Sequence, residues 1–500
     1  MRSLLTYVPL PGHLLLLLLA ILMRLPALLL PEYFLPEESL FLACGERITG
    51  ELSIYSDAWF EGPPLVIWVY SSFISVFGDG AMTAIRIFTA LYIYLFAAFF
   101  QGALTAYRIN ERRKNIPGIL LVVLLSIPWY GLTLGPALLS LIPFGYVMIL
   151  ILRLTLDEVP SRSALFYSGL FLAALIMTDY AGLVLTLAVF VAYLFLRGVR
   201  ISELITGVMG MGLGLFIAAS WLYVHDAFGS FLDIGFFTYF KNVFSQAPSP
   251  FDPDMGKLLV DIIVNWGPFL LLGGFGLFHY RVKLFSYVIV ARRLESIMLV
   301  WLIFGTIILV FSGSRLQVHD FALIAAPVTF YAAKAWELRK GIVIKTLTWV
   351  FVLGPLAILY LDMVSNYQGT WTALPSKVRA SFGVSHIEVR DWENVQELNL
   401  DTNASLWVAT SKAQFYSLLE KQPVTPFVDN RSAFHKIRYI NPDLGNEGVS
   451  DADLFRKFQK ELPDIIIDQG EVVPRLQKRF PTLFSAYRRT EAGIWSVWRK

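Results

Sequence analysis

The chain has 500 residues, of which 56% are hydrophobic and only 16% are charged, and its mean hydropathy is +0.60. Because water-soluble domains carry roughly a quarter charged residues, this composition excludes a set of ordinary soluble domains and predicts an integral membrane protein. The net charge of +3, without a basic block, argues against nucleic acid as a partner. The single cysteine, Cys44, excludes an internal disulfide framework and a cysteine-based metal cluster.

Charged residues are unevenly distributed along the chain. Residues 1–361 hold 44 of the 79 Asp, Glu, Lys and Arg, whereas the last 139 residues hold the other 35. We therefore expect a membrane module over 1–361 and a soluble tail over 362–500, about one domain long.

Apolar runs of about 20 residues are long enough to cross a bilayer as helices. The first run contains Arg24 and is not followed by a small-x-small cleavage site, so we expect a retained helix rather than a signal peptide. Eleven runs qualify as spans: 13–30, 81–107, 116–130, 132–153, 163–178, 181–197, 204–224, 258–279, 297–312, 320–336 and 342–361.

Basic residues orient these spans. With the amino terminus inside, the inner segments carry 17 Lys or Arg, whereas the outer loops carry only Arg47, Lys241, Lys257 and Arg315. This asymmetry follows the positive-inside rule and explains the basic net charge without an anionic partner. The odd number of spans predicts that the tail lies outside.

Two of the outer loops, 31–80 and 225–257, are long. The first contains eight acidic residues and one basic residue between apolar segments, and acids held close to hydrocarbon are usually functional. Apolar residues recur at helical spacing over 38–49, and 63–78 is apolar but too short to span comfortably. We expect two short helices lying along the membrane surface.

The tail is predicted to be a small open α/β sheet. Strand-like runs occupy 406–410, 423–429, 463–468 and 494–499, and helical stretches lie at 411–421, 450–461 and 473–480. The fold class expected for the whole chain is thus a polytopic α-helical membrane protein with a C-terminal soluble α/β domain.

The first outer loop carries the strongest motif. Two adjacent carboxylates, Glu37 and Glu38, open it; Tyr55 and Asp57 form a Tyr-x-Asp, and Pro63-Pro64 starts the second surface segment. This layout resembles the first periplasmic loop of the GT-C superfamily, polytopic glycosyltransferases with a polyprenyl-phosphate sugar donor such as the aminoarabinose transferases and protein O-mannosyltransferases. The resemblance implies that Glu37 is the catalytic base or an acceptor ligand, supported by Glu38 and Asp57.

A second stretch, 312–336, is similar to the outer loop of that family in which a basic residue and a histidine precede a helix with a midway proline. Arg315 and His319 match this pattern and are expected to hold the lipid phosphate. Many members have another acid after the third helix, but 128–140 contains none; Asp179, at the outer end of the fifth span, could replace it. With Tyr55 and Glu61, Asp179 completes the expected substrate contacts.

The expected chemistry also follows from the residue types. A carboxylate near the apolar boundary has a raised pKa and can take a proton from an acceptor hydroxyl or amine. The leaving polyprenyl phosphate needs a positive charge that is not lost as a proton, which an arginine supplies with paired planar donors. Outer acids could also hold a divalent cation.

The family resemblance implies an enzyme of the bacterial inner membrane with a periplasmic site and a periplasmic C-terminal domain. Its partners would be the polyprenyl-phosphate sugar donor, membrane lipids and a glycan, lipid or protein acceptor. Two alternatives stay open: a catalytically silent scaffold that binds a lipid or partner, and a transporter or flippase. A transporter usually shows related halves or matching broken helices, and the sequence shows no such symmetry.

Overall fold

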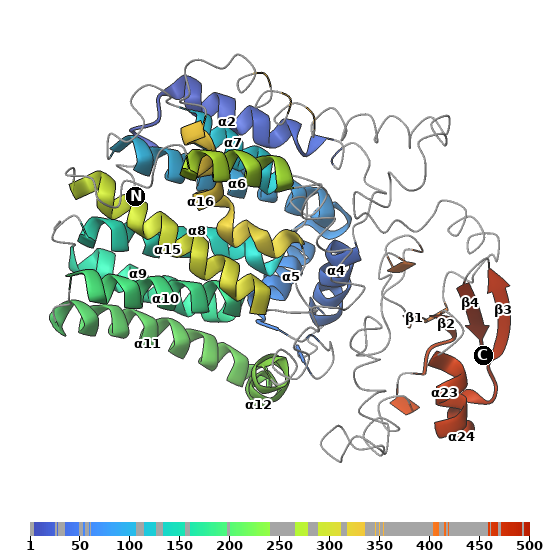
Figure 1. Cartoon of the computed structure of the whole chain (residues 1–500). Coiled ribbons are helices and arrows are strands. Elements are labelled where there is room, and N and C mark those ends of the chain that lie inside the picture. The colour runs from blue at the N-terminus through green and yellow to red at the C-terminus, as the bar shows by residue number, and fades with distance from the viewer. Residues whose placement is uncertain are drawn as a thin grey trace. The chain divides into compact units, whose positions relative to one another are not determined.

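The computed structural model divides the chain into two compact units (Figure 1). The first unit comprises Met1–Leu30, Ile85–Trp221 and Phe240–Val384, and the second comprises Pro31–Ala84, Leu222–Tyr239 and Ser385–Lys500. The structure describes residues 5–25, 28, 36–49, 54–55, 60, 62–106, 115–126, 134–155, 161–197, 201–240, 266–278, 289–311, 318–335, 346, 350, 354, 404–409, 415–416, 419, 459–460, 462–468, 472–492 and 495–500.

The first unit is a bundle of apolar helices. Its described helices are α2 (Leu10–Leu22), α6 (Ala81–Ala106, which starts in the second unit), α7 (Ile116–Ser126), α8 (Pro136–Thr155), α9 (Arg162–Thr178), α10 (Tyr180–Arg197), α11 (Ile201–Val224, which ends in the second unit), Trp266–Phe278, α15 (Ile289–Phe311), the 3-10 helix η6 (Val318–Ile324) and α16 (Ala325–Ala335). Helix α8 packs against α9, α10 and η6, α10 packs against α15, and α7 packs against α2 and α16. Ten of the eleven predicted spans thus coincide with described helices, and the last one, 342–361, lies largely outside the described residues.

Length and composition single out two of the described helical stretches as able to cross a membrane. These are the continuous stretch Leu65–Ala106 and helix Ile201–Val224, and shorter apolar helices of 10–17 residues accompany them. Side chains at the surface of α11, including Phe216, Ile217 and Val224, are large and apolar.

A proline inside α8 is compensated by a tyrosine from α6. Pro143 has no N–H, so it cannot donate the helical hydrogen bond to the Leu139 carbonyl, four residues earlier. The Tyr92 hydroxyl donates a hydrogen bond to that carbonyl, and it accepts one from the Ile142 N–H at 3.3 Å. The apolar bundle therefore keeps this backbone group satisfied where no water can reach it.

Glycines allow α9 and α11 to approach closely. A Cβ built on Gly210 would lie 2.0 Å from the Phe166 carbonyl oxygen, and one on Gly169 would lie 1.9 Å from the Gly207 carbonyl oxygen. Backbones in such close contact gain dispersion energy that larger residues would prevent, as is common between helices in membranes.

The second unit contains the two short helices predicted for the first outer loop. They are α4 (Pro36–Thr49) and α5 (Leu65–Phe77), which pack against each other and precede the 3-10 turn η1 (Gly78–Gly80). Gly45 permits this contact, because a Cβ there would lie 3.0 Å from the Ser71 nitrogen. The Phe41 ring meets the Tyr70 ring edge-on, with 5.5 Å between centroids. The unit also contains α12 (Phe228–Ser230) and the π-helix η3 (Phe231–Thr238), both from the segment 225–257.

The tail contains the expected small open sheet. Its strands β1 (Leu406–Val408), β2 (Ile465–Asp468), β3 (Arg488–Ala492) and β4 (Trp495–Arg499) lie in the order β1-β2-β4-β3, with β1 and β2 parallel and the other pairs antiparallel. Helices α23 (Val472–Arg479) and α24 (Pro481–Phe484) follow β2. The predicted strand 423–429 and helix 411–421 lie wholly or largely outside the described residues, and β3 was not predicted.

The end of β2 is tied to α23 and to β4 by one carboxylate. Buried Asp468 accepts hydrogen bonds from the Val472 and Val473 N–H groups at 2.9 and 3.0 Å, which cap the start of α23. Its other oxygen accepts a hydrogen bond from Trp498 Nε1 at 2.9 Å. These three hydrogen bonds give buried Asp468 a structural role, because they satisfy its carboxylate and join β2 to α23 and β4.

Candidate active site

Asp179 occupies the junction between α9 and α10, outside both helices, and is only 8% exposed. Its carboxylate accepts hydrogen bonds from Ser140 Oγ of α8 at 3.3 Å and from the Ala181 N–H at 2.9 Å. The absence of a side chain at Gly182 makes room for this contact, because a Cβ there would lie 3.1 Å from Asp179 Oδ2. Three helices therefore hold one buried carboxylate.

Asp320 adds a second carboxylate beside Asp179. It lies in η6, which packs against α8, the helix that carries Ser140. Burial, with a smaller contribution from repulsion by the Asp320 carboxylate, raises the pKa of Asp179 from 3.8 to about 6. Asp320 directly follows His319 in the sequence, and its pairing with Asp179 is a tertiary contact that no spacing indicates.

Helix α4 presents further acidic groups in the second unit. Glu38 and Ser39 are fully buried, and within the described part of the chain the Ser39 hydroxyl has no hydrogen-bond partner. Burial raises the pKa of the Glu46 carboxyl from 4.5 to about 7. Glu46 was counted among the loop acids but was not expected as a site residue, and its raised pKa depends on packing that the sequence does not display.

Tyr55 is fixed in an uncommon backbone conformation. Its φ of 74° lies in the left-handed region, which non-glycine residues rarely adopt. The buried side chain donates a hydrogen bond from its hydroxyl to the Gly62 carbonyl at 2.8 Å, and its ring lies 5.9 Å from that of Phe231 in η3. Gly235 makes room for the hydroxyl, because a Cβ there would lie 2.8 Å from it. Tyr55 thus connects the segments 31–80 and 225–257, and such backbone strain often accompanies function.

The other expected site residues are placed less fully. Glu37 belongs to α4 and His319 to η6, but their side chains are outside the described set, as are Asp57, Glu61 and Arg315 altogether. Among the described residues, no group of three or more His, Cys, Asp or Glu side chains is placed to hold a metal ion.

Chemically, the described groups can do two things. A carboxyl with a pKa near neutrality, such as that of buried Asp179 or half-buried Glu46, can hold or release a proton at physiological pH. A buried hydroxyl with no described hydrogen-bond partner, such as that of Ser39, can bond to a polar ligand, since buried polar groups are normally paired.

The chain has an ArnT-like fold, a helical bundle followed by a small C-terminal sheet. A solved structure of ArnT from Cupriavidus metallidurans bound to undecaprenyl phosphate matches with a TM-score of 0.56 and 16% sequence identity, over 97% of this chain and 96% of that chain. The apo structure of the same protein matches with a TM-score of 0.52 and 14% identity, over 92% of both chains. No protein-family model matches the sequence, and no curated protein does. The fold expected from the GT-C resemblance is therefore confirmed.

Proposed function

We propose that this chain is a glycosyltransferase that moves a sugar from a polyprenyl-phosphate donor to an acceptor at the outer face of the membrane. The observation that carries the proposal is the ArnT-like fold over 97% of the chain, because the matching ArnT structure binds undecaprenyl phosphate. A lipid of the same chemical class is thus the donor that this fold suits. The acceptor is a glycan, a lipid or a protein.

The acidic first loop supplies the base in this proposal. Glu37 takes the proton of the acceptor as its oxygen or nitrogen attacks the sugar carbon, and Glu38 and Asp57 support it. Glu38, one residue further along α4, is fully buried, which supports a role beside the base rather than at the protein surface. Glu46, with its pKa near 7, is a second candidate for proton transfer on the same helix.

Arg315 and His319 bind the lipid phosphate, and Tyr55, Glu61 and Asp179 contact the sugar or the acceptor. Asp179 and Asp320 together provide the outer acid that the segment 128–140 lacks. The bond between the sugar carbon and the phosphate oxygen breaks as the acceptor attacks, and the departing phosphate keeps the electron pair. The arginine then stabilises the negative charge on that phosphate.

The proposed topology completes the account. Residues 1–361 form the multi-pass module in the bacterial inner membrane, with the amino terminus in the cytoplasm, and 362–500 form a periplasmic domain that helps to hold the acceptor. A reporter fused after Lys340 should behave as cytoplasmic, and one fused after Lys500 should behave as periplasmic. Both reporters on one side would overturn this topology.

The catalytic test is substitution of the base. Glu37→Gln should keep the fold and donor binding but lower turnover by roughly two orders of magnitude or more, the usual scale for loss of a general base. Glu38→Gln is the comparison variant on the same helix, because Glu38 is the other member of the acidic pair. An unchanged rate in Glu37→Gln and a large loss in Glu38→Gln would assign the base to Glu38 instead. Activity before and after chelation tests the requirement for a divalent cation.

The phosphate test uses Arg315. Arg315→Lys keeps the charge but loses the planar pair of donors, so donor binding should weaken measurably, and Arg315→Ala should weaken it further. A mere headgroup anchor would tolerate lysine. Equal donor affinity in all three proteins, with thermal stability measured alongside, would remove Arg315 from the site.

The second candidate function is a catalytically silent scaffold, favoured by the missing acid in 128–140. A scaffold would bind the donor lipid as tightly as an enzyme but would not consume it. Binding without transfer, in the presence of cell-envelope acceptors, would therefore favour the scaffold.

A further inference from the structure

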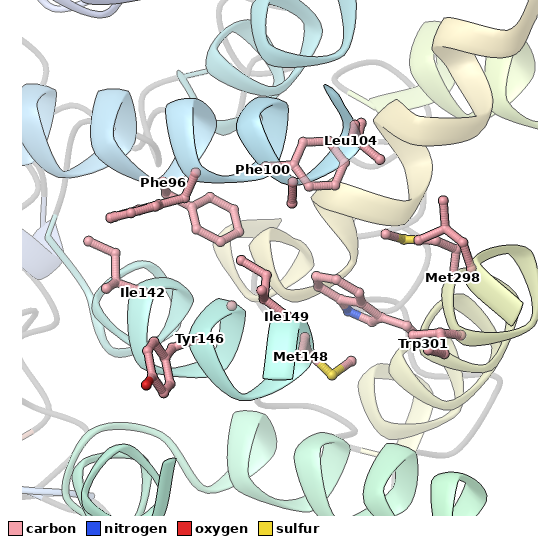
Figure 2. A pocket seen from close by; sticks show the side chains of 14 residues that line it. Phe96, Phe100, Leu104, Ile142, Tyr146, Met148, Ile149, Met298 and Trp301 are labelled. Carbon is pink, nitrogen blue, oxygen red and sulfur yellow. The ribbon is translucent and has the colours of Figure 1, made fainter. Parts of the chain in front are cut away.

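The apolar pocket between α6, α8 and α15 is a packing gap of the helical bundle. Figure 2 shows Phe96 and Phe100 of α6, Ile149 of α8 and Trp301 of α15 around it. Its cavity volume is about 40 Å³, and none of its lining residues is charged. An apolar cavity of this size stays dry and is too small for a ligand of several carbon atoms. The tail sheet, in contrast, has an open edge.

Strand β3 (Arg488–Ala492) is the last strand of the tail sheet. It lies beside β4 (Figure 1), and in the part of the chain that the structure describes no strand pairs with its other side. Its first four residues are all exposed. Because side chains alternate between the two faces of a sheet, both faces of the strand are open there. An open edge strand can pair with a strand of another chain.

The hydrogen bonds of β4 indicate which backbone groups of β3 point outward. Lys500, which follows β4, donates from its N–H to the Asp464 carbonyl at 3.0 Å, so even-numbered residues of β4 direct their backbone groups toward β2. The odd-numbered residues direct theirs toward their partners on β3, which are Arg488, Thr490 and Ala492. Arg489 and Glu491 therefore direct their N–H and C=O groups to the open edge.

The same two residues carry opposite charges on one face of β3. Arg489 and Glu491 are two positions apart, so their side chains project from the same face, and Arg489 Nη2 lies 3.2 Å from Glu491 Oε1. Arg489 Nε also donates a hydrogen bond to Ser496 Oγ of β4 at 3.0 Å, which orients the guanidinium. The two side chains are 46% and 74% exposed, so both are accessible to a second chain.

Only one antiparallel register of two β3 strands suits both the backbone groups and the charges. The outward N–H and C=O groups of two such strands can bond when Arg489 and Glu491 lie opposite each other or opposite themselves. Pairing a residue with its own copy would place two arginines or two glutamates face to face, which is destabilising. The register centred on Thr490 places Arg489 opposite Glu491 of the partner subunit, and the symmetric pair repeats this contact.

We propose that two copies of this chain associate through β3, which joins their tail sheets into one continuous antiparallel sheet. Arg489 and Glu491 of the partner subunit exchange both backbone hydrogen bonds and form a cross-strand ion pair, as does the symmetric pair. The two Thr490 side chains lie opposite each other, which is a favourable pair. The paired area is small, so the dimer is weak in dilute solution and is favoured where both copies lie in one membrane. Sugar transfer by the chain is not required for this association.

The proposal is tested by disulfide trapping of the full chain reconstituted in lipid vesicles. In the proposed register the two Thr490 Cα atoms form a non-hydrogen-bonded pair about 4.5 Å apart, which suits a disulfide. Thr490→Cys should therefore give, under mild oxidation, a product of twice the 56.5 kDa of one chain. Wild type, whose single cysteine Cys44 is buried, should give none.

Two further cysteine variants are controls for this crosslink. Thr482→Cys is the same change at an exposed position of α24, away from the edge, and should not crosslink. Arg488→Cys lies on β3, but in the proposed register its two copies are about 14 Å apart along the strands. That distance is too long for a disulfide, so this variant should not crosslink either.

Charge reversal tests the register. On the Thr490→Cys background, Arg489→Glu and Glu491→Arg each place like charges opposite each other, and each should lower the crosslinked fraction roughly tenfold. A mixture of the two variants, one of them tagged, should give a crosslinked heterodimer because every charge again meets its opposite. Arg489→Glu combined with Glu491→Arg in one chain should restore the homodimer. Thermal melting shows that each variant is folded.

Several results would overturn the proposal. Equal crosslinking of Thr490→Cys and Thr482→Cys would show that random collisions bring the chains together. Crosslinking that neither charge reversal lowers, or a mixture without the heterodimer, would exclude the proposed register. In cell membranes, a crosslinked product of Thr490→Cys with a mass other than that of two copies would assign the edge to another protein.

Discussion

Asp179 makes the stability of the first unit depend on pH in a predictable direction. Its pKa is raised from 3.8 to about 6, so the folded chain holds this proton more tightly than the unfolded chain does. The stabilisation from the protonated form is present below about pH 4 and is lost as the pH rises through about 6. At about 1.36 kcal/mol per pKa unit, the loss is about 3 kcal/mol at most.

The perturbation is Asp179→Asn, which keeps the shape and can still accept the hydrogen bond from the Ala181 N–H. Free energies of unfolding are measured by denaturant titration in detergent micelles between pH 4 and pH 8. The variant minus wild-type difference should move by up to about 3 kcal/mol in favour of the variant as the pH rises across this window. The altered hydrogen bonds of the variant shift its free energy of unfolding by the same amount at every pH. They therefore do not affect the pH dependence that is compared here.

Two further variants sharpen the test. Asp320→Asn removes a neighbouring negative charge that helps to raise the pKa of Asp179. The pH range over which stability is lost should therefore move to lower pH. Asp79→Asn changes an exposed acid in η1 and should leave the profile of the wild type intact. If the free energies of unfolding of wild type and Asp179→Asn depended on pH in the same way from pH 4 to pH 8, the raised pKa of Asp179 would be refuted.

Two packing features give further predictions. Gly210→Ala should destabilise the chain by about 1–3 kcal/mol or more, because the new Cβ would lie 2.0 Å from the Phe166 carbonyl oxygen. Gly212→Ala has open space around its Cβ and should be neutral or stabilising. Equal melting temperatures for the two variants would contradict the close contact between α9 and α11. Tyr92→Phe should cost about 1–3 kcal/mol by leaving a buried carbonyl unpaired. Adding Pro143→Ala should recover that loss by restoring the helical donor, and the absence of rescue in denaturant titrations would show that the tyrosine acts otherwise.

Helix positions were predicted well because charge and turn residues delimit apolar runs. The run 81–107 is helix α6 (Ala81–Ala106), and 163–178 is α9 (Arg162–Thr178), which starts after the Ser161 cap. The two short helices in the segment 31–80 were predicted from helical spacing and from the proline pair before α5. In each case the information is local, because a helix satisfies its own backbone hydrogen bonds.

Features that depend on distant segments could not be predicted in the same way. Strand β3 (Arg488–Ala492) has four exposed residues out of five and lies at the sheet edge, so it lacks the alternation that signals a strand. Asp320 lies near Asp179, and the Tyr92 hydroxyl donates a hydrogen bond to the Leu139 carbonyl of α8. Both interactions join residues that are far apart in sequence. Of the expected site residues, only Glu38, Tyr55 and Asp179 have described side chains, so the roles assigned to the set stay predictions.

The central claim is that this chain consumes a lipid-linked sugar, and the most direct measurement is release of free polyprenyl phosphate from a labelled polyprenyl-phosphate sugar. The purified chain is incubated with the donor and with cell-envelope extract as a source of acceptors, alongside Glu37→Gln. The account predicts release by wild type and a rate lower by roughly two orders of magnitude or more in the variant, with donor binding retained in both. Donor binding without release by wild type, or equal release by both proteins, would contradict it.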